Sequence, residues 1–164
     1  MGQSRRRATS ASTATVWADP MKITMESMIS LKPDIKELLE MEWSEYGLDW
    51  PFGLNPDWAF YTTLETQGAL WCFTMRQDGK LCGYVIFILS NHPHHKHKTC
   101  AKMDLFYVLP QFRAGFNSVK LLKYAEERMG ADFVMLSCAH GSRVDSLYKR
   151  MGYSAVETVY VKVK

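Results

Sequence analysis

MDLFYVLPQFRAGFNSVKLLKYAEE, residues 103–127, is the stretch that decides which fold this chain adopts. It begins with an apolar, strand-prone run at 105–109, and Pro110 ends that run because proline has no N–H group for a strand ladder. Apolar residues then recur at helical spacing from Val119 to a stop at Gly130. The pattern predicts a strand, a tight turn and a helix.

The turn between this strand and this helix, residues 113–118, is suited to binding a phosphate group. We expect Asn117 or Ser118 to cap the helix. A loop that enters a helix in this way directs backbone N–H groups and the positive end of the helix dipole at one point. The sequence therefore indicates an anion site at this turn.

The same stretch resembles the acyl-CoA-binding signature of the GCN5-related N-acetyltransferases. Their pattern is a strand ending in Val-x-Pro, then x-x-Arg-Gly-x-Gly-x-Gly or Ala, then an apolar helix, and residues 108–113 match its first half. The second half departs from the pattern: Ala114 replaces the first glycine, and Phe116 and Ser118 occupy the later small positions with Gly115 between them. Cβ atoms at these positions would restrict how closely a diphosphate approaches the backbone.

A second match to the family lies downstream. LYKRMGY, residues 147–153, resembles the Leu-Tyr-x-Lys-x-Gly-Phe run of these enzymes, and the two matches occur in the family's order. The resemblance extends over residues 21–164. It implies a single-domain α/β fold of the acyl-CoA N-acyltransferase type, with a mixed, mostly antiparallel sheet and helices on both faces.

The resemblance also implies acetyl-CoA as co-substrate and direct transfer of its acetyl group to a primary amine of a small molecule or a protein. Main-chain groups of the central strand would pair with the pantetheine arm, and the turn would hold the diphosphate. An asparagine that contacts pantetheine in the family is Gly141 here, and Ser142, Arg143 or His140 are its candidate replacements. The expected cofactor-binding residues are Phe106, Tyr107, Val108, Arg113, Ala114, Gly115, Phe116, Asn117, Ser118 and Ser142.

Two side chains are candidates for the chemistry. Asp104 is the only carboxylate on the central strand, where family members place a Glu or Asp that takes the acceptor's proton directly or through water. Desolvation by apolar neighbours would raise its pKa, although pairing with Lys102 or a histidine is the alternative interpretation. Tyr148 aligns with the family tyrosine that protonates the departing thiolate. Its position on an apolar helix face also suits an ordinary buried tyrosine.

The remaining elements follow from apolar periodicity and from turn residues. We expect an edge strand at 22–27, a helix from Lys32-Pro33-Asp34 to Gly47, a second helix from Asn55 or Pro56 to Gly68, a hairpin of 69–75 with 81–89, strands at 100–109 and 133–138, a helix from Ser142 to Gly152, and one or two closing strands within 153–163. The aromatic loop at 48–54 is expected either to form a wall of the acceptor site or to pack on the core.

Composition favours one domain. The 164 residues are 47% hydrophobic and 23% charged, and no apolar run reaches the roughly 18 residues of a membrane span. The net charge of +3 falls to +1 without residues 1–20, so the charge gives no strong signal for a nucleic-acid partner. We expect a cytoplasmic protein, with a homodimer as one option. Residues 1–20 are expected to be a disordered tail or an added extension before a start at Met21, with a mitochondrial targeting peptide as the alternative.

Cysteines and histidines complete the candidates. Cys72, Cys82, Cys100 and Cys138 have no C-x-x-C spacing and are expected to be buried free thiols, with one nucleophilic cysteine as the alternative. The cluster His92, His94, His95 and His97 is expected to form a solvated loop at the mouth of the site without a metal ion. The alternatives are a metal site, or a histidine that assists Asp104 or binds the acceptor.

Two other functions are compatible with these residues. The replaced glycines and Gly141 leave open a binding module that keeps the fold without catalysis. An acyltransferase with another acyl donor, or with a nucleobase or aminoacyl acceptor, is the second alternative.

Overall fold

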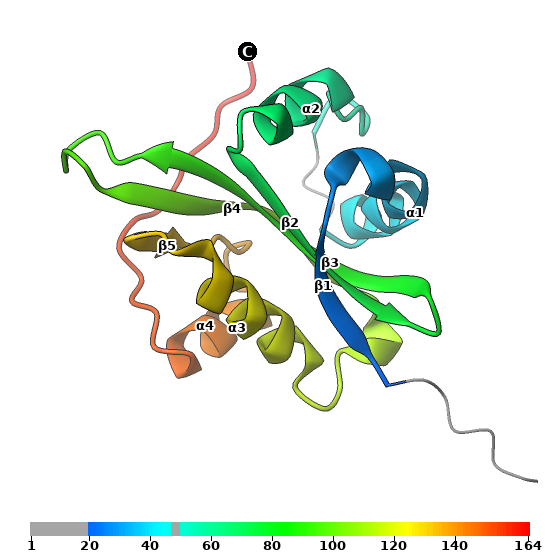
Figure 1. Ribbon diagram of the computed structural model, residues 1–164. Coiled ribbons are helices and arrows are strands. Elements are labelled where there is room, and N and C mark those ends of the chain that lie inside the picture. The colour runs from blue at the N-terminus through cyan, green and yellow to red at the C-terminus, as the bar shows by residue number, and fades with distance from the viewer. Residues whose placement is uncertain (1–19, 47–49) are drawn as a thin grey trace, which may run out of the picture.

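The protein is built around a five-stranded sheet. The computed structural model describes residues 20–46 and 50–164. Its strands lie side by side in chain order (Figure 1). The first four pair antiparallel, and the fifth runs parallel to the fourth. The strands are β1 Lys22–Glu26, β2 Leu70–Gln77, β3 Lys80–Asn91, β4 Thr99–Val108 and β5 Phe133–Met135.

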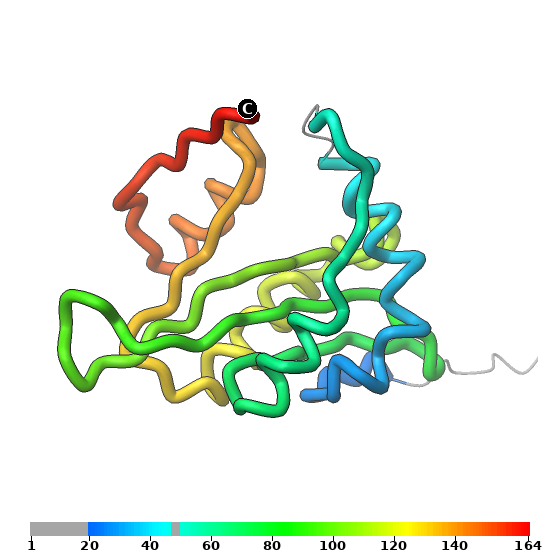
Figure 2. Tube along the Cα trace, turned by 90° about the horizontal axis from the view of Figure 1, so that it is seen from above, coloured from blue at the N-terminus to red at the C-terminus, as the bar shows by residue number. Residues whose placement is uncertain are grey.

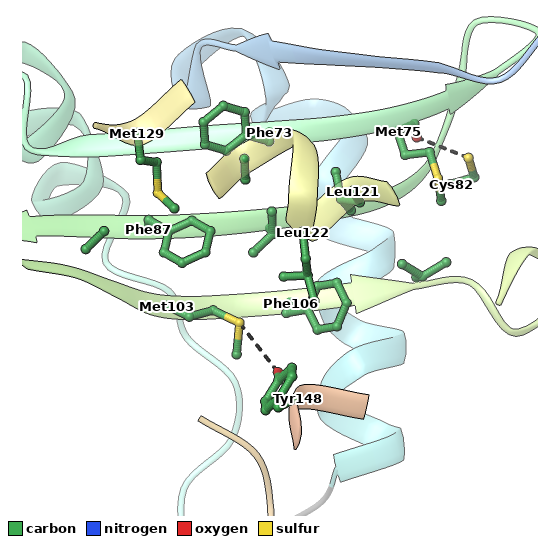
Figure 3. Close-up of a cluster of buried hydrophobic side chains, with 14 residues drawn as sticks. Phe73, Met75, Cys82, Phe87, Met103, Phe106, Leu121, Leu122, Met129 and Tyr148 are labelled. Carbon is green, nitrogen blue, oxygen red and sulfur yellow. Dashed lines mark hydrogen bonds between the residues drawn. The ribbon is translucent and has the colours of Figure 1, made fainter. Parts of the chain in front are cut away.

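Helices cover both faces of this sheet (Figure 1). One face packs against α1 and α2, and the other against α3 and α4, and each side has its own cluster of buried apolar side chains. Figure 3 shows the cluster beneath α3. The helices are α1 Met28–Tyr46, α2 Trp58–Thr66, α3 Asn117–Met129 and α4 Arg143–Arg150. The predicted mixed sheet with two helical layers is confirmed.

The strand, turn and helix predicted around Pro110 are present as β4, the short 3-10 helix Pro110–Phe112 and α3. The expected cap was wrong. Phe116 is the N-cap residue, with a φ of 63° and no capping side chain, and Asn117 donates from Nδ2 to the Phe112 carbonyl at 3.0 Å. The chain turns into the helix through two left-handed residues, Gly115 and Phe116, so Asn117 is already helical.

The predicted hairpin is confirmed as β2 and β3. Asp78 and Gly79 form its turn with φ values of 50° and 76°. Positive φ at both central residues matches the right-handed twist of the two strands, and an Asp-Gly pair tolerates it.

The first helix begins earlier than predicted, at Met28, and Pro33 lies inside it. The reason is a contact from outside the helix. The Glu65 carboxylate on α2 accepts hydrogen bonds from the backbone N–H groups of Met28 at 2.6 Å and Ile29 at 3.3 Å, and from Ser27 Oγ at 3.1 Å. A carboxylate at this position satisfies free N–H groups and complements the helix dipole.

Three other boundaries differ from expectation. α2 is capped by Asp57, whose side chain accepts from the Phe60 N–H, and not by Asn55 or Pro56. β5 contains only three residues, and its Phe133 side chain is exposed. In the part of the chain that the structure describes, no strand follows β5, and residues 154–164 are exposed. Alternating apolar and polar residues, as in 153–163, form a strand only where a neighbouring strand of a sheet pairs with them.

The expectations for residues 1–19 and for a helix end at Gly47 lie outside the described residues. Within 20–46 and 50–164, no helix is both long and apolar enough to cross a membrane.

Removal of the Glu65 carboxylate is expected to destabilise the protein, because three donors at the start of α1 lose their acceptor. Glu65→Ala should lower the free energy of unfolding by about 1–2 kcal/mol, the usual cost of losing a helix cap. Urea unfolding followed by circular dichroism measures this change. Glu37→Ala, at an exposed position of α1, is the control, and equal stability of the two variants would contradict the capping role.

Candidate active site

β4 and β5 separate after a short pairing, and the site lies at this separation. They pair only from Cys100 with Phe133 to Lys102 with Met135. The chain then leaves the sheet through residues 136–142 and enters α4 (Figure 2). β4 continues to Val108 without this neighbour. A cavity of 690 Å³, which we name the first cavity, lies along β4 between α1 and α2 on one side and 137–140 with α4 on the other.

A second cavity of 700 Å³ lies beside the turn that enters α3 and shares Tyr46, Phe106 and Val144 with the first. It is lined by the turn and by α4, and its charged residues are mostly basic. Those charged residues are Arg113, Arg143, Arg150 and Glu45. Such a lining suits a diphosphate.

The predicted cofactor residues divide into two groups. Most of them line the second cavity: Phe106, Val108, Arg113, Gly115, Phe116, Ser118 and Ser142. Ala114 and Asn117 do not line it, and Tyr107 is buried against α1 on the opposite face of β4. Arg150, in the last turn of α4, also lines this cavity and was not predicted.

The departures from the glycine pattern leave the second cavity open. The Phe116 side chain is 77% exposed, so it lies at the surface and does not fill the turn. A Cβ built on Gly115 would meet no atom within 4 Å. The residues present therefore fit a diphosphate, and the exposed Phe116 ring is part of the lining of this cavity.

Arg113 is held in place by an acidic partner. Its two terminal nitrogens each donate to Glu45 at 2.6 Å, and its Nε donates to the Val108 carbonyl at 2.7 Å. Its guanidinium lies 5.3 Å from the centre of the Tyr107 ring. The hydrogen bonds from Arg113 lower the pKa of Glu45. A diphosphate would meet an arginine that is already paired with a carboxylate.

Asp104 lies in the first cavity because of an irregularity in β4. Ile86 pairs with Leu105 and Phe87 with Met103, so Asp104 is an extra residue in the ladder. Such a bulge redirects a side chain. Asp104 is exposed, and its carboxylate accepts from the Tyr61 hydroxyl at 2.7 Å, so its partner is neither Lys102 nor a histidine.

Tyr148 reaches the same cavity from α4. Its ring is 7% exposed, and its hydroxyl donates to the Ser137 carbonyl at 3.3 Å and lies 3.7 Å from Met103 Sδ (Figure 3). Burial raises the pKa of the phenol, so it keeps its proton at neutral pH. Tyr148 and Asp104 therefore line one cavity from two different elements.

Glu42 on α1 is a lining residue of the first cavity that the sequence analysis missed. It is half-buried and accepts a hydrogen bond from the Tyr84 hydroxyl. A signal was present, because Ile35, Leu38 and Leu39 form a buried stripe on α1, and position 42 continues that stripe with a carboxylate.

The aromatic loop and the histidine loop have different positions. Residues 53–56 line the first cavity, which supports the acceptor-wall interpretation, whereas 48–49 lie outside the described residues. The histidine loop is not at the mouth of the site: it joins β3 to β4, and no histidine of 92–97 lines either cavity. His92 and His95 instead lie 4.8 and 5.6 Å from the Phe133 ring.

Among the described residues, no group of three or more His, Cys, Asp or Glu side chains is arranged to hold a metal ion. Three cysteines are buried free thiols as predicted, but Cys138 is exposed and lines the first cavity, because β5 ends before it reaches that position.

Comparison with known proteins identifies the family. The profile of the acetyltransferase (GNAT) family matches residues 35–153. The chain belongs to the GNAT acetyltransferase family. Acetyl-CoA is the co-substrate of this family, as the sequence analysis expected. The curated proteins include no significant match to this chain.

Solved structures of GNAT acetyltransferases share the fold. Ribosomal-protein-alanine N-acetyltransferase from Brucella melitensis biovar Abortus 2308 is 21% identical, with a TM-score of 0.65 over 88% of this chain and 99% of that one. Glucosamine-6-phosphate N-acetyltransferase from Arabidopsis thaliana is 16% identical, with a TM-score of 0.66 over 88% and 99%. A predicted acetyltransferase from Clostridium acetobutylicum, solved with acetyl-CoA, is 12% identical, with a TM-score of 0.65 over 88% and 96%.

Release of Arg113 from Glu45 is expected to strengthen anion binding in the second cavity. Exposed ion pairs contribute roughly 0.2–1 kcal/mol, so Glu45→Gln should tighten coenzyme A binding by up to about fivefold at low salt. Isothermal titration calorimetry measures this affinity, with Glu40→Gln on the same helix as control. Weaker binding in Glu45→Gln would instead assign Glu45 the role of orienting Arg113.

Proposed function

We propose that this GNAT protein transfers the acetyl group of acetyl-CoA directly to a primary amine of a small molecule. The observation that carries the proposal is the meeting of two cavities at the separation of β4 and β5, one basic and one lined by Asp104 and Tyr148. The cytoplasmic location and a homodimer remain predictions.

The second cavity is proposed to hold the diphosphate. Arg143 and Arg150 of α4 face it together with Ser118 near the N-terminus of α3. Backbone N–H groups at a helix start and arginine side chains are the usual partners of phosphate oxygens. The pantetheine arm would then follow β4 along Phe106 and Val108, where β5 no longer pairs.

The first cavity is proposed to hold the acceptor. Its volume of 690 Å³ falls within the range of small-molecule sites. Its walls combine aromatic side chains, among them Trp43, Tyr46 and Tyr61, with the carboxylates of Glu42 and Asp104. Such a lining favours an amine that carries a positive charge on an apolar or aromatic body.

The chemistry is assigned to two side chains. The amine nitrogen attacks the thioester carbonyl, and Asp104 contacts the acceptor amine and takes a proton from it directly or through water. The carbon–sulfur bond then breaks, and Tyr148 gives its phenolic proton to the departing thiolate. The raised pKa of Tyr148 means that this proton is present at neutral pH.

Acetyl transfer to phenethylamine, a cationic amine with an aromatic body, tests the proposal. We expect thiol release that requires both substrates, together with a rise in melting temperature on addition of acetyl-CoA alone. Arg143→Gln should weaken acetyl-CoA binding roughly tenfold, because a charge-assisted contact is lost, whereas Lys80→Gln at the exposed start of β3 should not. No stabilisation by millimolar acetyl-CoA would instead favour a binding module without catalysis.

Tyr148→Phe separates acid catalysis from packing, because it removes only the hydroxyl. The variant should bind acetyl-CoA as the parent protein does and release thiol roughly 10²- to 10³-fold more slowly, the usual effect of one general acid. Calorimetry measures the binding and single-turnover assays measure the rate. An unchanged rate would make Tyr148 a packing residue only.

A further inference from the structure

The first cavity contains a second carboxylate besides Asp104, and the proposed mechanism has not used it. We propose that Glu42 is a further catalytic residue, which takes the proton that the acceptor's ammonium group loses before the nitrogen can attack. This inference rests on the proposed function, because it concerns the acceptor half of the same site.

Glu42 is fixed by the core although it lines a cavity. It follows Ile35, Leu38 and Leu39 on the buried stripe of α1, so its side chain points toward the sheet. The hydroxyl of Tyr84, a fully buried residue of β3, donates to the carboxylate. The backbone N–H of Phe106 on β4 supplies a second hydrogen bond. These two donors hold the carboxylate at the wall beside β4, where the acceptor would lie.

Among the described residues, the groups that act on the Glu42 carboxyl are acidic or phenolic or belong to the backbone, and the Arg113 guanidinium in this region is paired with Glu45. The acidic groups near it are Asp104 and Glu45, and its phenolic neighbours are Tyr46, Tyr61, Tyr84 and Tyr107. Tyr148, Cys138 and His140 face the same cavity, and no lysine or arginine of the described residues lines it. An ammonium group that enters the cavity would therefore be its principal positive charge.

This environment makes Glu42 more basic than an ordinary glutamate. Burial raises the pKa of the Glu42 carboxyl, the hydrogen bonds from Tyr84 and Phe106 oppose that effect, and the negative charge of Asp104 adds to it. A carboxylate with a raised pKa accepts a proton more readily near neutral pH. Asp104, the other carboxylate of this cavity, is exposed and accepts a hydrogen bond from the Tyr61 hydroxyl.

The proton balance provides a task for each carboxylate. The acceptor nitrogen loses one proton as it changes from ammonium to free amine, and a second as the tetrahedral adduct becomes an amide. Glu42 takes the first proton and Asp104 the second, while Tyr148 donates one to the thiolate. Asp104 then returns its proton to the Tyr148 phenolate, and Glu42 releases its proton to solvent. One proton is released per acetyl group transferred, as the overall reaction requires.

Carbon-13 NMR of the glutamate carboxyl groups tests the proposal without any turnover. We expect one resonance that titrates above the usual glutamate range, is absent from Glu42→Gln and is retained in Glu40→Gln, an exposed position of the same helix that lines neither cavity. Phenethylammonium should lower its midpoint, because a nearby cation favours the ionised form, and neutral 2-phenylethanol should not. A midpoint of the Glu42 titration that stays the same when phenethylammonium is added would overturn the proposal.

The pH dependence of kcat/KM provides the second test. Activity should fall as pH drops through the pKa of Glu42, because the protonated carboxyl cannot accept a proton. Tyr84→Phe should move this acidic limb to higher pH, since the Tyr84 hydrogen bond lowers that pKa, and Asp104→Asn should move it to lower pH. Glu42→Gln should lose the limb and slow thiol release from acetyl-CoA with phenethylamine by roughly 10²- to 10³-fold.

The outcomes separate this inference from the proposed function. A wild-type protein that acetylates phenethylamine, combined with a Glu42→Gln variant of unchanged rate and pH profile, would overturn the role of Glu42 alone. Absence of stabilisation by acetyl-CoA would overturn the proposed function. If Glu42→Gln does not fold, the titration of the wild-type carboxyl and the profile of Tyr84→Phe still decide the matter.

Discussion

The short pairing of β5 with β4 is the constraint on which the rest of the site depends. Three paired residues anchor β5, and the chain then departs toward α4. This departure leaves one side of β4 without a strand from Met103 onward, and both cavities lie along that length. A longer β5 would satisfy more backbone groups, but it would also close the space in which the two cavities lie.

The two cavities differ in charge, and this difference follows from which elements supply their walls. α4 and the turn before α3 bring arginines to the second cavity, whereas α1 and the bulge of β4 bring carboxylates to the first. The ion pair of Arg113 and Glu45 stands at the second cavity, where it reduces the net positive charge. An anionic cofactor and a cationic acceptor would thus be drawn to different ends of one site.

Much of the fold was accessible from local sequence rules. The Asp-Gly turn, the Pro110 strand end and the helix from Ser142 follow from backbone preferences that act over a few residues. The ends of helices and strands that depend on a residue far away in the sequence were predicted wrongly. Glu65 starts α1 from another helix, and residues 153–163 alternate like a strand but have no paired edge in the described structure.

The sequence by itself determined the family, the strand–turn–helix motif and the placement of Asp104 on a strand and Tyr148 on a helix, because short-range spacing and backbone geometry encode these features. Only the tertiary structure decided which groups share a cavity. Glu42 lies 62 residues before Asp104, and Arg113 meets Glu45 across 68 residues. Contacts over such separations arise from the packing of α1 and α4 against the sheet, and no local pattern specifies them.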